Sequence, residues 1–283
     1  PLSLNAFIDP PLIRAAYKSI PLIKRITHSI FRHGHLIKLQ QVIISETKQA
    51  IATLAGVGES PKTAYRAFPH SEDGIRRFFN SLNWSRPWAA GGQAACLAVF
   101  LKTQGPMFIE EDLLNRYLKL YAELYEKLLD TQTGAYFRGN RPEYGELING
   151  AMKVLTALDW LGVPIHKPER LIDTVLSGFP SPEGCHLVDA VYVLYRCLKE
   201  TDYRRKDVQK YASELLSMIM KHHNDDGGFS YYIGRSQMDY QGFPVSKGLK
   251  ESDIHGTCLL TWAVAMVAHI MEYREYPWQV IKP

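Results

Sequence analysis

The alternation of two kinds of apolar segment constrains the fold more than any other feature of this chain. Segments 111–129 and 207–222 repeat apolar residues at steps of three and four, which is the pattern of a helix with one buried face. Other segments are apolar on every side yet too short or too interrupted to cross a bilayer, so protein must surround them. These fully apolar segments are Ala89–Leu101, Gly145–Leu161, Leu187–Leu198 and Asp253–Met271.

This alternation predicts an all-α fold with two layers of helices. One-faced helices would form an outer ring around an inner ring of buried helices, which is the architecture of an α/α toroid, or barrel. A bundle of four long helices would not alternate in this way. The chain shows no strand pattern and no low-complexity linker, so we interpret residues 1–283 as a single toroid domain that includes basic amphipathic helices at about 10–55.

The fully apolar segments should supply the core of the toroid. The residues expected in that core are Leu147, Leu155, Val193, Leu194, Leu259, Trp262 and Val264. Two stretches are expected to be loops. Residues 55–73 are rich in Gly, Pro, Ser and Thr and should form a surface loop, and the long stretch Ser230–Lys250 is typical of a lid or a binding loop.

Composition narrows the classes of partner. The formal net charge of +4 is mild, and the basic residues do not form the concentrated stripe that nucleic-acid binding requires, so no nucleic-acid partner is expected. The basic stretch from Lys18 to Lys38 is interleaved with apolar residues, and it suits either peripheral contact with an anionic membrane or a solvated helix face. Nothing in the pattern indicates an oligomeric state.

Cysteine usage and the absence of targeting patterns bear on location. Cys96, Cys185, Cys197 and Cys258 form no CxxC pair and no metal-finger spacing, and three of them fall within the apolar helices. Reduced thiols in a cytoplasmic protein fit this pattern better than a disulfide framework. No uncharged apolar stretch is long enough to span a membrane, and the first residues do not resemble a signal peptide.

Three polar residues at the starts of inner helices are the candidate catalytic group. Asp189 and Asp253 each lie near the beginning of an apolar helix, where a carboxylate either caps the helix or faces a cavity. His255 follows Asp253 closely enough for a contact that would orient its imidazole. Because the inner helices of a toroid run parallel, we expect all three side chains to gather at one mouth, where positive helix ends also favour anions.

Further polar and aromatic residues are candidates for substrate binding. They lie near the starts of the inner helices or in the loops that precede them. They are Glu146, Asn149, Tyr144, Arg138, Arg235, Tyr240, Trp88, Phe229 and Tyr231. Each type also has a purely structural role: a polar residue can cap a helix, an arginine can solubilise a surface, and an aromatic ring can fill the core.

Two segments resemble the helical toroid superfamily of terpenoid cyclases and protein prenyltransferase β subunits. The run Asp226-Gly227-Gly228-Phe229, followed by Asp253-Ile254-His255-Gly256-Thr257, is similar to the Gly-Gly loop and Asp-x-x-His-Thr helix of the prenyltransferases. The segment Leu187–Tyr192 resembles their Asp-x-Cys zinc segment. The resemblance covers roughly the C-terminal third, and it implies a toroid with a central cavity for an isoprenoid substrate.

Departures from that family's motifs bear on its chemistry. Val191 stands where the family has a zinc-binding cysteine, which leaves Asp189 and His255 as two ligands where a catalytic zinc needs three, so no metal and no other cofactor is expected. The Asp-x-Asp-Asp acid motif of the cyclases is absent, with Glu251-x-Asp253 as its nearest equivalent. No Asp-Asp-x-x-Asp diphosphate motif occurs either.

The residues therefore leave three functions open. The first is an enzyme that acts on an isoprenoid, with a small-molecule or lipidic substrate and acid–base chemistry at Asp253 and His255. The second is a carbohydrate-active α/α-barrel enzyme, either a polysaccharide lyase or a glycoside hydrolase. The third is a noncatalytic binding module, since a fold does not fix a function. A deep apolar cavity would favour the first, and an open polar groove with aromatic rings would favour the second.

Overall fold

The structure is a computed structural model that describes residues 6–7, 35–240, 243–275 and 277–283. Its architecture is all-α, as predicted. The helices are α3 (His35–Gly56), α4 (Glu72–Ser81), α5 (Pro87–Thr103), α6 (Glu111–Glu126), α7 (Tyr144–Leu161), α8 (Pro168–Leu176), α9 (Gly184–Cys197), α10 (Arg205–Ile219) and α11 (Ile254–Ile270). Two short 3-10 helices, Gly105–Met107 and Met220–His222, extend the loops after α5 and α10.

Local sequence signals set several helix ends. The Ser71 hydroxyl accepts a hydrogen bond from the amide of Gly74 and so caps α4. Pro87 begins α5, and a proline also begins α8, at the position where the missing N–H costs nothing. Gly162 ends α7 in the left-handed conformation, with φ of 71°.

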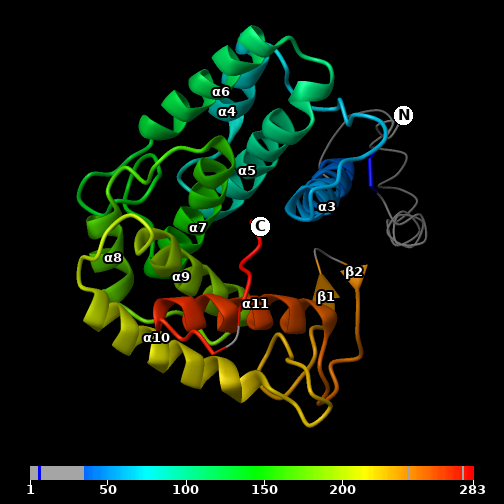
Figure 1. The fold of residues 1–283 in the computed structure, drawn as a ribbon. Helices are drawn as coiled ribbons and strands as arrows, with labels where there is room; N and C mark the ends of the chain where they lie inside the picture. The colour runs from blue at the N-terminus through cyan, green and yellow to red at the C-terminus, as the bar shows by residue number, and fades with distance from the viewer. Residues whose placement is uncertain (1–5, 8–34, 241–242, 276) are drawn as a thin grey trace.

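Five helices pack against one another in chain order to form the inner layer. Helix α3 packs on α5, α5 on α7, α7 on α9, and α9 on α11. Helices α6, α8 and α10 pack against the outside of this series, and α4 packs on α6. Figure 1 shows the result as an open arc, with α3 near one end and α11 at the other. Each of the four fully apolar segments is an inner helix, and both one-faced segments are outer helices.

Two outer helices had no counterpart in the sequence prediction. Helices α4 and α8 are short, and each buries one face through residues such as Phe79 and Ile172. The expected surface loop at 55–73 is largely non-helical, although Tyr65 and Phe68 within it are buried. Helices α4 and α8 escaped the sequence prediction because an amphipathic pattern over so few turns does not stand out from its surroundings.

The predicted core residues divide between α7, α9 and α11. Leu147, Leu155, Val193 and Leu194 are buried, as predicted. Leu259, Trp262 and Val264 are only half-buried, and Cys258 beside them is exposed, so the prediction was wrong for α11. The reason is position, because α11 ends the helix series and has an inner-layer neighbour on one side only.

A loop between η2 and α11 reaches across to the other end of the arc. Within the predicted loop, β1 (Asp239–Tyr240) and β2 (Phe243–Pro244) form a two-residue antiparallel hairpin that the sequence pattern had not indicated. The Tyr240 hydroxyl donates to Oε1 of Glu46 on α3, over 3.4 Å. This contact joins the α11 end of the series to the α3 end.

The C-terminal segment, residues 277–283, makes a second connection and runs through the interior of the arc in Figure 1. The indole N–H of Trp262 on α11 donates to the carbonyl of Ile281 over 3.2 Å, and that of Trp160 on α7 donates to the carbonyl of Pro283 over 2.8 Å. Ile281 packs so closely over Gly56 that a Cβ there would lie 2.6 Å from its Cγ2. The C-terminal segment therefore ties α3, α7 and α11 together.

Two sequence expectations concern membrane contact. Within the described ranges, none of the helices combines the length and the apolar character that crossing a bilayer demands. The basic stretch from Lys18 to Lys38 lies mostly outside the described residues, as do the amphipathic helices expected before His35.

Candidate functional site

The starts of four inner helices lie side by side, linked by a chain of hydrogen bonds. The backbone amide of Trp88 in α5 donates to Oε1 of Glu146 in α7 over 2.9 Å. Asn149 of α7 pairs with Nδ1 of His186 in α9, over 2.9 Å. The amide of Gly184 in α9 donates over 3.1 Å to the carbonyl of Tyr231, which belongs to the loop before α11.

Asp253 is the cap of α11, and both of its carboxylate oxygens are engaged. Oδ1 accepts from the amide of Gly256 at 2.7 Å, which is the capping contact. Oδ2 accepts from the amides of Tyr231 at 2.8 Å and Gln237 at 3.0 Å. Asp253 therefore fixes the loop over α11, and of the two roles open to it from the sequence it has the structural one.

His255 is held between aromatic rings at the start of α11. Its ring lies parallel to that of Tyr231, with 5.2 Å between centroids, and meets Tyr240 edge-on at 5.1 Å. Its Nδ1 is 2.7 Å from Oε1 of Gln237. The expectation that Asp253 orients the imidazole by direct contact is thus corrected. The carboxylate oxygens of Asp253 accept hydrogen bonds from backbone amides, and the side chain of Gln237 orients the imidazole instead.

The protonation state of His255 follows from its surroundings. Burial lowers its pKa, nearby Lys153 also lowers it, and the negative charge of Asp253 opposes them. The imidazole is therefore neutral at neutral pH. Because the Oε1 atom of Gln237 can only accept, Nδ1 carries the proton, and Nε2 keeps the free lone pair that a general base needs.

Asp189 differs from Asp253 in lacking hydrogen-bond donors. Its side chain lies in the first turns of α9 and is 1% exposed, and its Oδ2 is buried without a hydrogen-bond partner in the described part of the chain. Burial raises the pKa of this carboxyl group to about 6, although the charge of Lys153 partly opposes the shift. A buried acid with a pKa near neutrality is the kind of group that active sites use.

Cys185 connects Asp189 to the His255 group. The Cys185 thiol contacts the Tyr231 hydroxyl and lies within electrostatic range of Asp189. Burial, followed by the charge of Asp189, raises the pKa of the thiol to about 11, so it is protonated at neutral pH. We call Asp189, Cys185, Tyr231, Gln237, Tyr240 and His255, together with Lys153, the inner cluster.

Two predicted binding residues, Asn149 and Trp88, lie next to the inner cluster through their contacts with His186. Asn149 is buried and pairs with His186, whose ring is 5.3 Å from that of Trp88. Glu146, in contrast, accepts from the backbone of Trp88 and acts as a cap for α5, because that helix has no capping side chain of its own.

Tyr144 and Phe229 point away from the inner cluster. The Tyr144 hydroxyl donates to the carbonyl of Val175 at 2.8 Å and meets the Tyr211 hydroxyl at 3.1 Å, so it packs between the outer helices α8 and α10. Phe229 is buried, and its ring contacts His223. Both are structural aromatics, which corrects their assignment to a binding surface.

The two predicted arginines are also peripheral. Arg138 is exposed and donates to Oδ1 of Asn80 over 3.2 Å, and Arg235 is exposed with its guanidinium 4.8 Å from the Tyr232 ring. Both side chains lie at the surface, each next to a neighbouring side chain. The expectation that the two arginines bind an anion in the cavity is therefore corrected.

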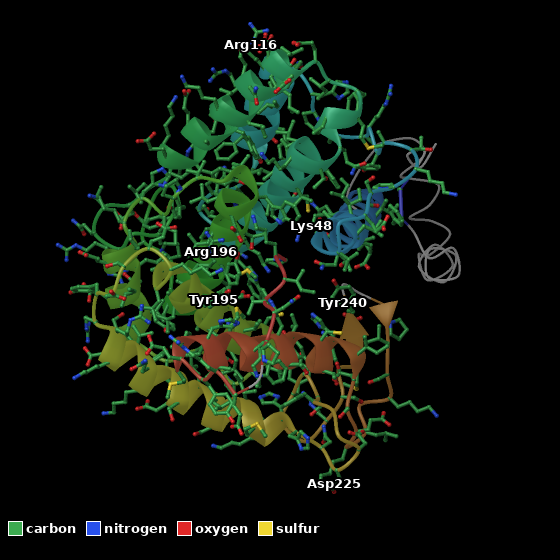
Figure 2. All side chains as sticks on the ribbon, in the orientation of Figure 1. Lys48, Arg116, Tyr195, Arg196, Asp225 and Tyr240 are labelled. Carbon is green, nitrogen blue, oxygen red and sulfur yellow. The ribbon has the colours of Figure 1, made fainter. Side chains whose placement is uncertain are left out.

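Sequence reasoning missed the basic residues of the inner face. Lys153 lies in the middle of α7, within residues 147–158 that are otherwise uncharged, and Lys48 lies in α3. Figure 2 shows Lys48 on the side of α3 that faces the arc interior. A lone charge in the middle of this apolar run is a signal that could have identified Lys153, because a buried charge must be compensated.

No metal centre is visible in the inner cluster. Within the ranges that the structure describes, His, Cys, Asp and Glu side chains nowhere form a group of three that could hold a metal ion. Asp189 and His255, the two positions that resemble zinc ligands, belong to the same cluster, but Gln237 already occupies one nitrogen of His255.

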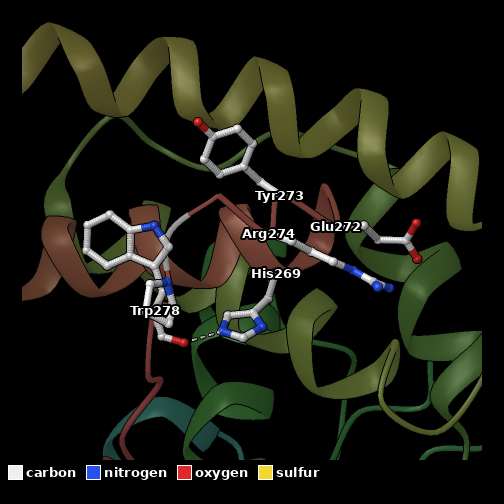
Figure 3. Close-up of a pocket in the computed structure, with 6 residues that line it drawn as sticks. His269, Glu272, Tyr273, Arg274 and Trp278 are labelled. Atoms are coloured by element: carbon white, nitrogen blue, oxygen red, sulfur yellow. Dashed lines mark hydrogen bonds between the residues drawn. The ribbon is translucent and has the colours of Figure 1, made fainter.

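A shallow pocket of about 350 Å³ lies at the opposite end of α11 (Figure 3). Its lining residues are His269, Glu272, Tyr273, Arg274, Pro277 and Trp278. Nε2 of His269 is 2.9 Å from the carbonyl of Trp278. Since a helix rises about 1.5 Å per residue, this pocket is about 20 Å from His255 and forms no part of the inner cluster.

Comparison with other proteins identifies no relative. No model of a known protein family, no curated protein and no solved structure matches the chain. Function must therefore be inferred from the geometry and chemistry of the inner cluster.

Proposed function

We propose that the chain is an α/α-toroid enzyme that transfers protons on a carbohydrate substrate at the inner cluster. The observation that carries this proposal is the setting of His255. A neutral imidazole, fixed through Nδ1 by Gln237 and sandwiched against Tyr231, presents Nε2 as a base. A base with a fixed orientation, next to two tyrosine rings, suits general acid–base catalysis.

The lining of the inner face supports a sugar as substrate. The inner cluster combines polar side chains with the aromatic rings of Tyr231 and Tyr240, and Trp88 lies against the neighbouring His186. Aromatic faces suit the apolar faces of sugar rings, and the polar groups suit hydroxyls. An isoprenoid would leave these polar groups without partners, which costs about 1 to 3 kcal/mol for each buried one.

Lyase chemistry fits the groups present. His255 would take the proton next to the carboxylate of a uronic acid, and the released electron pair would form the new carbon–carbon double bond. The glycosidic bond would break toward its oxygen, which would take the proton of the Tyr240 hydroxyl. No water is consumed, so the reaction needs no second carboxylate to activate one. Hydrolysis would require a pair of acids, whereas Asp253 is committed to backbone amides.

The isoprenoid enzyme is the second candidate, and one observation favours it. Asp189 is a carboxyl group held in an apolar setting, where an acid can protonate a carbon–carbon double bond or a leaving group. It lies within the Leu187–Tyr192 segment that resembles the prenyltransferase motif. A toroid would serve either substrate, since the fold alone does not choose.

The setting of the cysteines supports a reducing, cytoplasmic location for this enzyme. Cys96 and Cys197 are buried, Cys185 and Cys258 are apart from them, and all four are free thiols. A lipidic substrate, and contact of the basic N-terminal stretch with a membrane surface, belong to the isoprenoid candidate.

The test is a substrate panel with variants of the inner cluster. Purified protein is incubated with uronate-containing polysaccharides, neutral polysaccharides and prenyl diphosphates. Ultraviolet absorbance detects the unsaturated product of a lyase, new reducing ends detect hydrolysis, and phosphate release detects prenyl chemistry. We expect lyase activity on uronates, reduced at least about a hundredfold in His255→Ala and Tyr240→Phe.

Arg235→Ala serves as the matched control, because Arg235 lies in the same loop but faces solvent. It should keep full activity. Activity on prenyl diphosphates alone would select the second candidate, and no loss of activity in His255→Ala would remove the inner cluster from the chemistry.

A further inference from the structure

Two lysines of the inner face have no acidic partner. Lys48 in α3 and Lys153 in α7 are both half-buried. Within the described ranges, the ion pairs of lysines and arginines lie elsewhere, and neither ammonium group donates a hydrogen bond. Lysines this enclosed are usually paired, so the lack of partners calls for an explanation.

Lys153 lies where the inner helices converge. Its charge acts on titratable groups of four other helices: Lys48 in α3, Cys96 in α5, Asp189 in α9 and His255 in α11. Its Cβ also packs against α5, because a Cβ at Gly91 would lie 2.9 Å from it. The side chain therefore starts at the α5–α7 contact, and titratable groups of α3, α9 and α11 lie within its electrostatic range.

Lys48 is close enough to Lys153 for the two to repel each other. Burial is the main cause that lowers the pKa of Lys48 to about 8; the charge of Lys153 contributes in the same direction and Cys96 opposes the shift. Two enclosed like charges are unfavourable by themselves. They become favourable when an anion lies between them.

The acids around the two lysines do not neutralise them. Asp253 gives its lone pairs to three backbone amides, and Glu46 accepts from Tyr240. Asp189 is within electrostatic range of Lys153, but it is buried and its own pKa is raised to about 6. The neighbouring thiols of Cys96 and Cys185 have raised pKa values and are uncharged at neutral pH.

We propose that Lys48 and Lys153 together form a binding site for the anionic group of the substrate, either a carboxylate or a phosphate. This inference rests on the proposed function only in placing the anion beside His255. For a uronate, the lysines would neutralise the carboxylate next to the carbon that loses its proton. For a prenyl diphosphate, they would hold the phosphates. A lysine binds both as a point charge, so the site itself is common to the two.

Calorimetric titration tests the site directly. Inorganic pyrophosphate represents the phosphate source and trigalacturonate the carboxylate source. We expect at least one to bind, about tenfold or more weakly in Lys48→Met and in Lys153→Met, since each variant removes a charge-assisted contact with the anion. Lys153→Arg should retain binding. Lys102→Met is the control, because Lys102 is an exposed lysine of the inner helix α5.

A proton measurement distinguishes this site from nonspecific attraction. An anion that contacts Lys48 raises the pKa of its ammonium group, so binding near pH 8 should take up protons, as seen by repeating the titration in buffers of different ionisation enthalpy. Proton uptake should disappear in Lys48→Met. Folding of each variant is checked by its thermal transition, and methionine keeps the length of the lysine stem.

Failure of the site and failure of the proposed function give different results. Tight anion binding without lyase activity would overturn the function and support the site. Lyase activity that survives in Lys48→Met and Lys153→Met would overturn the site and leave the function. Equal weakening in Lys102→Met, or binding of neither anion, would also overturn the site.

Discussion

Helices α9 and α11 begin alike in sequence but differ in structure. Each follows a Gly-rich loop and carries an aspartate near its start, Asp189 in α9 and Asp253 in α11. Helix α9 has inner-layer neighbours on both sides, whereas α11 has one. Asp253 has three backbone donors, while Asp189 is buried with an oxygen that has no hydrogen-bond partner among the described residues.

The difference separates a carboxylate whose hydrogen bonds are satisfied by the backbone from one that is buried with an oxygen left without them within the described ranges. Hydrogen bonds from backbone amides stabilise the charge of Asp253. The same bonds occupy its carboxylate oxygens, which are then not available to a substrate. The charge of Lys153 only partly offsets the burial of Asp189, so the charged form of this carboxyl group lowers the stability of the fold. Destabilised groups of this kind are common where a protein performs chemistry.

The largest expected effect concerns the packing of the two helices. Leu194→Ala in α9 should lower the free energy of unfolding by about 3 to 5 kcal/mol, because the side chain is 0% exposed and its loss leaves a cavity. Leu259→Ala in α11 should cost only about 1 to 2 kcal/mol, since Leu259 is half-buried. Urea denaturation measures both. Equal losses would remove the distinction between a central and a terminal inner helix.

Replacement of the cap should be the next largest effect. Asp253→Ala should cost about 2 to 4 kcal/mol, because it removes the helix cap and leaves the amides of Tyr231 and Gln237 without their acceptor. Asp225→Ala, at an exposed loop position, should change stability by less than about 0.5 kcal/mol. A cost for Asp253→Ala as small as that of the control would contradict the structural role.

Replacement of Asp189 should act in the opposite direction. Asp189→Asn should raise the stability at pH 7 by about 1 to 3 kcal/mol, because it removes a buried charge whose pKa is raised from 3.8 to about 6. If the panel selects prenyl diphosphates, the same variant should also lose activity, because Asp189 is the acid of that candidate. Thermal unfolding and turnover are measured on one preparation, and a variant that is less stable and fully active would reverse the assignment.

The pH dependence provides the finest comparison. A carboxyl group with a raised pKa binds its proton more tightly in the folded chain, so the wild type loses stability as the pH rises from about 4 through about 6. Asp189→Asn lacks this loss. The difference in stability between the two proteins should therefore grow across that window and become constant above it, as denaturant titrations at several pH values can show.

The two layers of helix could be predicted from the sequence because periodicity reports burial directly. Helices buried on every side and helices with one buried face differ in pattern over several turns, as in α7 and α6. Helices α4 and α8 were missed because they are too short for that difference to emerge. The half-burial of Leu259 was missed because it depends on the number of neighbours of α11, and periodicity carries no such information.

The candidate site was predictable only in part. The gathering of Asp189, Tyr231 and His255 follows from helix starts that share one side of the fold, and helix starts are marked in the sequence by loops. Which acid is capped depends on loop geometry, and the sequence does not show that the amide of Gln237 meets Asp253. Lys48 and Lys153 come from the middles of distant helices, so only their common position in space reveals them as a pair.

The closure of the arc has a mechanical consequence. Successive inner helices from α3 to α11 pack directly on one another, whereas among the described residues α11 and α3 are connected through Tyr240 and the C-terminal segment. We expect the arc of helices to widen or narrow first at this seam between α11 and α3. Lys48 lies on α3 at one side of that seam and His255 lies on α11 at the other. The width of the seam therefore sets the length that a substrate needs to contact both residues.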